Sequence, residues 1–169
     1  MLIIVMGVCG CGKTTIGQSL AQKLSCEFAD ADDFHSEENK RKMAESTPLT
    51  DSDRKPWLIK LHGLLLSWNT TRLHGVLACS ALRKSYREIL RCGTTTGISL
   101  DILFVYLKGS FRVINDRLNA RIGHYMPAGM LKSQLDTLEE PGPPENHLTL
   151  SVEGQRTDIV DEVLRRISK

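Results

Sequence analysis

The segment that most constrains the fold of this 169-residue chain is Gly7-Val8-Cys9-Gly10-Cys11-Gly12-Lys13-Thr14. It matches the pattern G-x-x-x-x-G-K-[ST], and it stands between the short apolar run Leu2–Met6 and a helical pattern over 13 to 24. Glycines let the backbone turn its N–H groups toward an anion, and the dipole of the following helix favours negative charge. The segment therefore predicts a strand, a phosphate-binding loop and a helix in that order.

The same motif assigns roles to its residues. Lys13 should reach the β- and γ-phosphates of ATP, Thr14 should place its hydroxyl on Mg²⁺, and Thr15 could add a further hydroxyl contact. A glycine turn with an exposed lysine is the alternative interpretation. The predicted ATP-binding residues of this segment are Gly7, Val8, Cys9, Gly10, Cys11, Gly12, Lys13, Thr14 and Thr15.

Apolar runs alternate with helical patterns along the rest of the chain. Strands are predicted at 2–6, 75–79 and 102–107, with weaker candidates at 27–29 and 148–150. Helices are predicted at about 13–24, 36–45, 83–92, 110–121, 127–138 and 156–168, and another has Pro56 in its first turn. This alternation predicts an α/β fold, a parallel sheet with helices on both faces whose ligands lie beyond the carboxyl ends of the strands.

Composition narrows the class of protein. With 41% hydrophobic and 25% charged residues, the chain is expected to form one globular domain over residues 1–169. A net charge of +2, without a basic stripe, argues against nucleic-acid binding, and no apolar run is long enough for a membrane span. The five cysteines lack paired C-x-x-C spacing, so we expect free thiols and a cytoplasmic location.

Acidic residues follow the second predicted strand. The strand through Val76 ends in Cys79-Ser80 without the acid that nucleotide hydrolases usually carry there, whereas Asp30-Ala31-Asp32-Asp33-Phe34-His35 follows the strand at 27–29. We expect Asp32 to accept the proton of an attacking hydroxyl, with a turn-capping role as the alternative. Asp30 and Asp33 fit local caps or contacts to metal-bound water, and His35 could hydrogen-bond a polyol.

Two arginines recur on one face of the predicted helix at 110–121. Arg117 and Arg121 are four residues apart, so they could clamp a nucleotide when the segment 123–127 folds over it as a lid. A solvated basic face is the alternative.

Several further segments match one family of kinases. They are 30–35, 39–43, Pro48-Leu49-Thr50-Asp51-Ser52-Asp53-Arg54-Lys55-Pro56-Trp57-Leu58, Cys79-Ser80-Ala81-Leu82-Arg83-Lys84, Leu107-Lys108-Gly109, Arg121-Ile122-Gly123-His124 and Leu138-Glu139-Glu140-Pro141. Over nearly its whole length the chain thus resembles the gluconokinases. The resemblance implies phosphorylation of D-gluconate to 6-phospho-D-gluconate by ATP and Mg²⁺, serving the pentose phosphate pathway. It also implies a P-loop fold like that of nucleoside monophosphate kinases, a small helical lid at about 117–137, and a homodimer.

The resemblance also implies a substrate site. Asp32 aligns with the acid beside the substrate hydroxyl, and His124 falls in a motif that the family shares. Because a carboxylate is best held by a bidentate donor, Arg54 is the first candidate for the gluconate carboxylate and Arg87 the second, unless either is a surface ion pair. Ser80 could donate to a substrate hydroxyl or simply end its strand.

Two alternatives for the function remain open. The acceptor could be another small hydroxyl compound, such as shikimate or a nucleoside monophosphate, or the protein could be a nucleotide-dependent switch without transfer. Cys9 and Cys11 replace the serines usual in the family's loop. A thiol near Lys13 and a helix N-terminus should have a lowered pKa, which predicts an oxidation-sensitive loop, unless two small residues are merely tolerated there.

Overall fold

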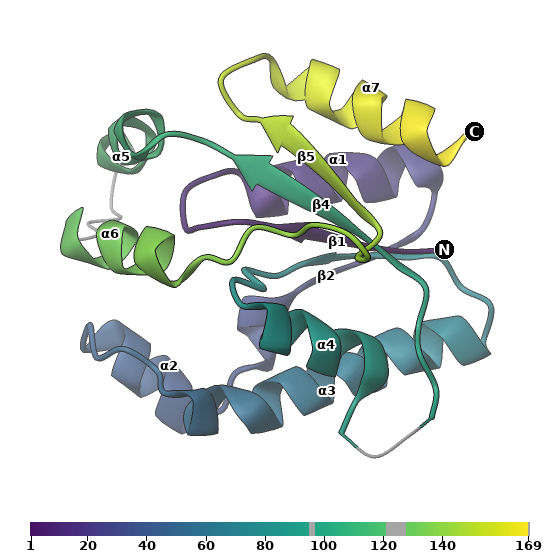
Figure 1. Cartoon of the computed structure of the whole chain (residues 1–169), viewed down its shortest axis with the longest axis horizontal. Helices are drawn as coiled ribbons and strands as arrows, with labels where there is room; N and C mark the ends of the chain where they lie inside the picture. The colour runs from purple at the N-terminus through teal and green to yellow at the C-terminus, as the bar shows by residue number, and fades with distance from the viewer. Residues whose placement is uncertain (95–96, 121–127, 169) are drawn as a thin grey trace.

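The computed structural model describes residues 1–94, 97–120 and 128–168, which form a five-stranded sheet with helices on both faces (Figure 1). In chain order the elements are β1 (Leu2–Met6), α1 (Lys13–Leu24), β2 (Glu27–Asp30), the 3₁₀ turn η1 (Ala31–Phe34), α2 (Glu37–Ala44), α3 (Asp51–Thr70), β3 (Gly75–Ala78), α4 (Lys84–Cys92), β4 (Ile102–Lys108), α5 (Phe111–Asn119), α6 (Ala128–Thr137), β5 (His147–Ser151) and α7 (Arg156–Ile167).

The sheet is parallel throughout and has the strand order β2-β3-β1-β4-β5. β1 is central, pairing with β3 from Leu2↔Gly75 onward and with β4 as far as Met6↔Tyr106. Every residue of β1 and β3 is buried, which explains their unbroken apolar sequences. The segments that leave β1, β2 and β3 therefore emerge at one edge of the sheet, where the predicted ligand site should lie.

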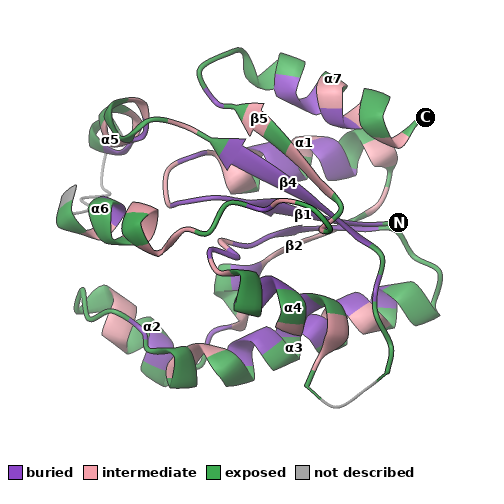
Figure 2. Cartoon of the chain, in the orientation of Figure 1, coloured by how far each residue is buried: buried purple, intermediate pink, exposed green. Residues whose placement is uncertain are grey.

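Two hydrophobic cores cover the two faces of the sheet. On one face, α1 and α7 contribute Ile16, Leu20 and Val160 to a core that also contains Ile3 and Val5 of β1. On the other face, α3 and α4 contribute residues such as Leu61, Leu65 and Leu90. The buried stripes of these helices face the sheet and their exposed stripes face solvent (Figure 2). The predicted fold class is therefore confirmed.

The largest difference from the sequence prediction is the start of α3. We expected Pro56 in the first helical turn, but the helix begins at Asp51, so Pro56 lies inside it. A capping box fixes the earlier start, because the Thr50 hydroxyl accepts from the Asp53 N–H at 3.1 Å and the Asp53 carboxylate accepts from the Thr50 N–H at 2.9 Å.

The helical lid expected at 117–137 includes the end of α5 and all of α6, whereas residues 121–127 lie outside the described part of the chain. Within the described ranges, no helix combines the length and apolar character that crossing a bilayer requires.

Candidate phosphotransfer site

The loop between β1 and α1 has a shape that only glycine allows at key points. Gly7 has a φ of 143° and Gly10 a φ of 81°. A Cβ atom on Gly7 would lie 2.8 Å from the Cys11 Sγ, and one on Gly10 would lie 2.7 Å from the Leu118 side chain. Both the backbone angles and the close contacts therefore exclude larger residues.

Hydrogen bonds hold the loop, one from the segment after β3 and others within the loop itself. Its Gly7 N–H donates to the Ser80 carbonyl at 3.3 Å, and its Cys11 N–H donates to the Val8 carbonyl at 3.3 Å. The same Val8 oxygen accepts from the Lys13 ammonium at 3.0 Å. Lys13 thus lies against the phosphate loop, next to the unpaired N–H groups that begin any helix such as α1.

The acids at the end of β2 and in η1 lie beside this loop. The Thr14 hydroxyl donates to an Asp30 oxygen at 2.6 Å, and the other Asp30 oxygen accepts the Asp32 N–H at 3.0 Å, which caps η1. A hydroxyl beside a carboxylate is an oxygen donor pair of the kind Mg²⁺ prefers. Among the described residues no three His, Cys, Asp or Glu side chains group as a metal site.

Asp32 has the electrostatic surroundings of a proton acceptor. Its pKa is raised above its ordinary 3.8, mainly because neighbouring protein removes part of its hydration and because Asp30 is close, while Lys13 acts in the opposite direction. Lys13 is thus near enough to Asp32 to act on its charge. A carboxylate with a raised pKa is a stronger base than an ordinary aspartate, so the site can take a proton from a hydroxyl near the phosphates.

His35 is buried and uncharged. Its ring stacks on Trp57 at a centroid distance of 4.2 Å, and the Trp57 indole donates to the Ala31 carbonyl at 2.8 Å. Burial, helped by the charges of Arg54 and Lys40, lowers the pKa of His35 to about 4.

The tautomer of His35 follows from Asn39. The Asn39 amide nitrogen donates to the Asp53 carbonyl at 3.0 Å and lies 3.5 Å from His35 Nδ1, so that ring nitrogen accepts and the proton resides on Nε2. His35 can therefore offer one N–H donor to a substrate without carrying charge.

Two guanidinium groups lie over the Tyr86 ring, and one of them, Arg54, also acts on the charge of His35. The Cζ atoms of Arg54 and Arg83 lie 5.7 and 5.8 Å from the centroid of the Tyr86 ring. Arg83 also pairs with Asp51 at 3.2 Å, and the Tyr86 hydroxyl donates to the same carboxylate. Sequence reasoning missed Arg83, although its place just beyond the carboxyl end of a central strand was a usable signal.

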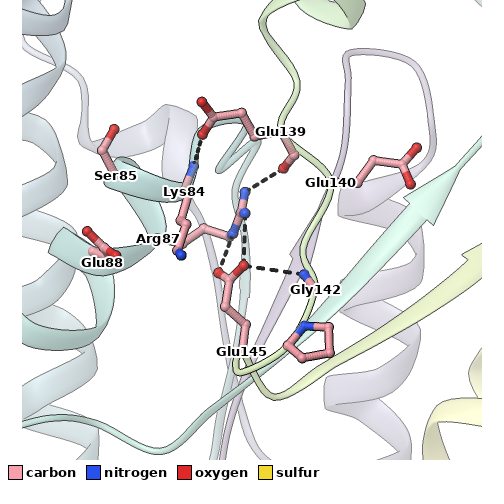
Figure 3. A pocket seen from close by; sticks show the side chains of 9 residues that line it. Lys84, Ser85, Arg87, Glu88, Glu139, Glu140, Gly142 and Glu145 are labelled. Atoms are coloured by element: carbon pink, nitrogen blue, oxygen red, sulfur yellow. Dashed lines mark hydrogen bonds and ion pairs between the residues drawn. The ribbon is translucent and has the colours of Figure 1, made fainter.

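Arg87 does not fit its predicted role as a ligand of the substrate carboxylate. It is 1% exposed and its Nε and Nη2 atoms hold Glu145 at 2.7 and 3.0 Å (Figure 3). Its Nη1 atom donates to the carbonyls of Ala81 at 3.0 Å and Glu139 at 2.9 Å. Arg87 lies on the buried face of α4 with Tyr86 and Leu90, so its guanidinium supports the loop after β3 instead.

A cavity of about 490 Å³ lies beside Arg87, between α4 and the segment 139–145 (Figure 3). Four carboxylates and only two cations line it, namely Glu88, Glu139, Glu140 and Glu145 against Lys84 and Arg87. Because this charge balance repels anions, the cavity is a poor match for a carboxylate substrate.

The other predicted residues fall in three groups. Ser80 is half-buried two residues after β3, and its carbonyl accepts from the Gly7 N–H of the phosphate loop. Arg117 donates to the Val152 carbonyl and is close enough to Cys11 for its charge to act on that thiol. Arg121 and His124 lie outside the described residues.

The prediction of a reactive thiol is wrong for Cys11. Its side chain is 2% exposed, and burial raises its pKa above the ordinary value, although Lys13 and Arg117 act in the opposite direction. The positive charges near Cys11 are visible in the sequence, whereas the larger effect of desolvation arises only in the folded chain. Cys9 is half-buried, and its N–H donates to the Gln134 side chain at 2.7 Å.

Comparison with known proteins shows the family of the chain. The family model of shikimate kinase matches residues 9–168. A probable gluconokinase of Xenopus tropicalis is 45% identical over 96% of this chain and 91% of its own length, and the gluconokinase of Gluconobacter oxydans is 43% identical over 96% and 89%. The crystal structure of a gluconokinase from Sinorhizobium meliloti superposes with a TM-score of 0.86 at 40% identity, covering 98% of this chain and 90% of that one. With its phosphate loop and its carboxylates at the edge of a parallel sheet, the chain belongs to the gluconokinase family of P-loop kinases.

Proposed function

We propose that the protein transfers the γ-phosphoryl group of ATP to the terminal hydroxyl of D-gluconate, giving 6-phospho-D-gluconate and ADP. The observation that carries the proposal is a set of side chains that act on one another. Lys13 acts on the charge of Asp32, Arg54 acts on the charge of the neutral His35, and Arg54 and Arg83 both lie over the Tyr86 ring. Gluconate offers a partner to each kind of group, since it has a reacting hydroxyl, further hydroxyls and a carboxylate.

The ATP end of the site is the loop from Gly7 to Thr15. Its backbone N–H groups and the N-terminus of α1 would hold the phosphates, while Lys13 would leave the Val8 carbonyl for the β- and γ-phosphates. Arg117, with Arg121 as the second predicted arginine, would contact the nucleotide from α5. Thr14, supported by Asp30, would hold Mg²⁺, which when bound neutralises charge that develops on the transferring phosphoryl group.

Asp32 would act as the base of the reaction. As the gluconate oxygen attacks the γ-phosphorus, its proton passes to the Asp32 carboxylate, the bond from phosphorus to the ADP oxygen breaks, and Lys13 stabilises the charge of the transferring group. The raised pKa of Asp32 suits this role, because it increases the affinity of the carboxylate for the proton.

The acceptor end would recognise a polyol that carries a carboxylate. The Nε2–H group of His35 and the Ser80 hydroxyl would donate to gluconate hydroxyls, with His124 as the third predicted contact. Arg54 and Arg83 would bind the carboxylate. Because Arg54 already donates to the Leu49 carbonyl and Arg83 to Asp51, both guanidinium groups are held in place before substrate arrives.

Acceptor specificity is the direct test of the proposal. ADP release should be measured with Mg·ATP and each of gluconate, shikimate, AMP, CMP and dephospho-coenzyme A. We expect turnover with gluconate alone. The alternative, a kinase for another small hydroxyl acceptor, is favoured by the match to the shikimate kinase model. It predicts faster turnover with shikimate or a nucleotide, and that result would overturn the assignment.

The carboxylate site has its own test. Arg54→Met and Arg83→Met should each raise the KM for gluconate roughly 10- to 100-fold, because a hydrogen bond to a charged group contributes about 1.5–3 kcal/mol. The KM for ATP should stay unchanged. Arg91→Met, at an exposed position on the same helix as Tyr86, is the matched control. Equal KM values for gluconate in all three variants would refute this part of the proposal.

We further propose that residues 1–169 form one kinase domain with a lid at about 117–137. We also propose that the protein acts in the cytoplasm as a homodimer. No disulfide joins the five cysteines, all of which lie in the described residues, and this supports a reducing compartment. Light scattering should give a mass twice the 18.9 kDa of one chain; a mass of 18.9 kDa would refute the dimer.

A further inference from the structure

Gln134 of α6 contacts the phosphate loop although no sequence motif connects them. Its Oε1 atom accepts the Cys9 N–H at 2.7 Å, a contact between residues 125 positions apart. Because a backbone N–H can only donate, the atom facing it must be the amide oxygen of the glutamine.

The contact fixes one peptide unit of the phosphate loop. The Cys9 N–H and the Val8 carbonyl belong to one planar peptide group, so the direction of the first determines the direction of the second. The Val8 oxygen accepts from both the Lys13 ammonium at 3.0 Å and the Cys11 N–H at 3.3 Å. Gln134 therefore acts, through this plane, on the group that holds the phosphate-binding lysine.

Packing holds Gln134 in position. Leu131, three residues earlier on α6, is fully buried in the same core as Val8 and Cys11 of the loop. Residues three apart on a helix share a face, so the apolar contact of Leu131 presents Gln134 to the loop. From α5, Leu118 contacts the loop at Gly10, where there is no room for a Cβ atom. The two helices thus support the loop from one side, and Gln134 supplies the hydrogen bond.

We propose that Gln134 is a positioning residue for ATP binding. It orients the Val8–Cys9 peptide so that the Val8 carbonyl keeps Lys13 beside the phosphate site before nucleotide binds. Without this acceptor the peptide plane can rotate, and ATP must then restore the loop and Lys13 to their binding arrangement, which weakens its affinity. The inference depends on the proposed binding of ATP at this loop but not on the identity of the acceptor.

Two variants and one control test the role. Gln134→Met keeps the length of the side chain and removes the acceptor, whereas Gln134→Glu keeps an acceptor oxygen. Lys132→Met changes an exposed neighbour on α6 and serves as the control. Hydrogen exchange of the Cys9 amide in the nucleotide-free protein should accelerate in Gln134→Met only. Titration calorimetry with Mg²⁺ and a non-hydrolysable ATP analogue should show a Kd roughly 2- to 10-fold higher in Gln134→Met than in Lys132→Met.

The kinetic constants separate positioning from general damage. The KM for gluconate should stay within about 2-fold of the unaltered protein in Gln134→Met, because the loop and not the acceptor site has changed. Unchanged exchange at Cys9, or an unchanged Kd for the ATP analogue, would overturn the proposal. Accelerated exchange in Gln134→Glu as well would also overturn it, since that side chain can still accept the hydrogen bond. If Gln134→Met fails to fold, Gln134→Ser, whose side chain is too short to reach the Cys9 N–H, replaces it in the exchange and calorimetry measurements with the same expected and contradicting results.

Discussion

Replacing Arg87 by methionine should destabilise the protein and leave its affinity for gluconate unchanged. The guanidinium group is 1% exposed and holds Glu145 through two hydrogen bonds of 2.7 and 3.0 Å. It also donates to the carbonyls of Ala81 and Glu139. Ala81 has a φ of 44°, an unfavourable backbone angle that this hydrogen bond helps to hold. Methionine fills similar space but removes the donor that the Glu145 carboxylate and the carbonyls of Ala81 and Glu139 share.

The expected loss follows from the burial of the pair. Glu145 is only 14% exposed, so removing Arg87 leaves a carboxylate that water reaches poorly. Breaking a buried ion pair on one side costs about 3–5 kcal/mol. For a chain of this size each kcal/mol lowers the Tm by about 2–4 °C, so Arg87→Met should melt roughly 6–20 °C below the unaltered protein.

The double variant Arg87→Met, Glu145→Gln separates the charge from the packing. It leaves no unpaired charge, so it should recover part of the lost Tm. Acid should reproduce the effect of the arginine substitution. Partial burial opposes the ionisation of Glu145, but the hydrogen bonds and charge of Arg87 together hold its pKa below the ordinary 4.5. The pair therefore stabilises the fold above about pH 4.5, and its contribution is lost as the pH falls through the lowered pKa.

Differential scanning calorimetry and steady-state kinetics on the same samples give the answer. We expect a large fall in Tm with a KM for gluconate within about 2-fold of the unaltered protein, a factor that corresponds to less than about 0.5 kcal/mol. A Tm within about 2 °C of the original, combined with a KM for gluconate raised tenfold or more, would refute the structural role. That result would instead favour Arg87 as a ligand of the substrate carboxylate.

Three further predictions follow from the site. Asp32→Asn should lower kcat by about 10²–10⁴ while calorimetry shows an unchanged affinity for ATP, and an unchanged kcat would contradict the role of Asp32 as base. Because the raised pKa of Asp32 means that folding disfavours its charged form, the variant should also melt at a higher temperature. The ring protons of His35 should titrate in NMR spectra with a midpoint near pH 4, and a midpoint near pH 6.5 would contradict its burial. Because the pKa is lowered, the neutral ring contributes stability above about pH 6.5, and this contribution is lost as the pH falls toward 4. Gly10→Ala should lower the free energy of unfolding by about 1–2 kcal/mol because of the φ of 81° alone, and by more through the contact with Leu118. It should also weaken the binding of ATP. A melting curve unchanged from the original would contradict the tight packing of the loop.

Local chemistry explains which parts of the fold could be predicted from the sequence. The phosphate loop and α1 over 13–24 agree with prediction because glycines, lysine and threonine at fixed spacing specify a strand, a turn and a helix within a few residues. Strands β1, β3 and β4 agree because short apolar runs bounded by turn residues are typical of strands covered on both faces. The start of α3 differs because the Thr50 capping box outweighs the signal from Pro56.

The parts of the site that depend on distant partners could not be predicted in the same way. Arg87 and Glu145 are 58 residues apart, so nothing near Arg87 distinguishes a buried structural cation from a substrate ligand. Gln134 reaches Cys9 over 125 residues. The pKa of Cys11 depends on burial that the tertiary structure alone creates, and the sequence shows only the nearby charges. Arg83 was within reach of sequence reasoning, whereas its shared contact with Tyr86 was not.

The most direct test of the account follows the phosphorus atoms. Purified protein, Mg·ATP and gluconate should be observed by ³¹P NMR as the reaction proceeds. We expect the γ-phosphate signal of ATP to disappear while ADP and one new phosphomonoester appear, split by protons into a triplet because the phosphate is on a primary carbon. If ATP stays intact, or if its γ-phosphate appears only as inorganic phosphate, the protein does not transfer phosphoryl groups to the terminal hydroxyl of gluconate.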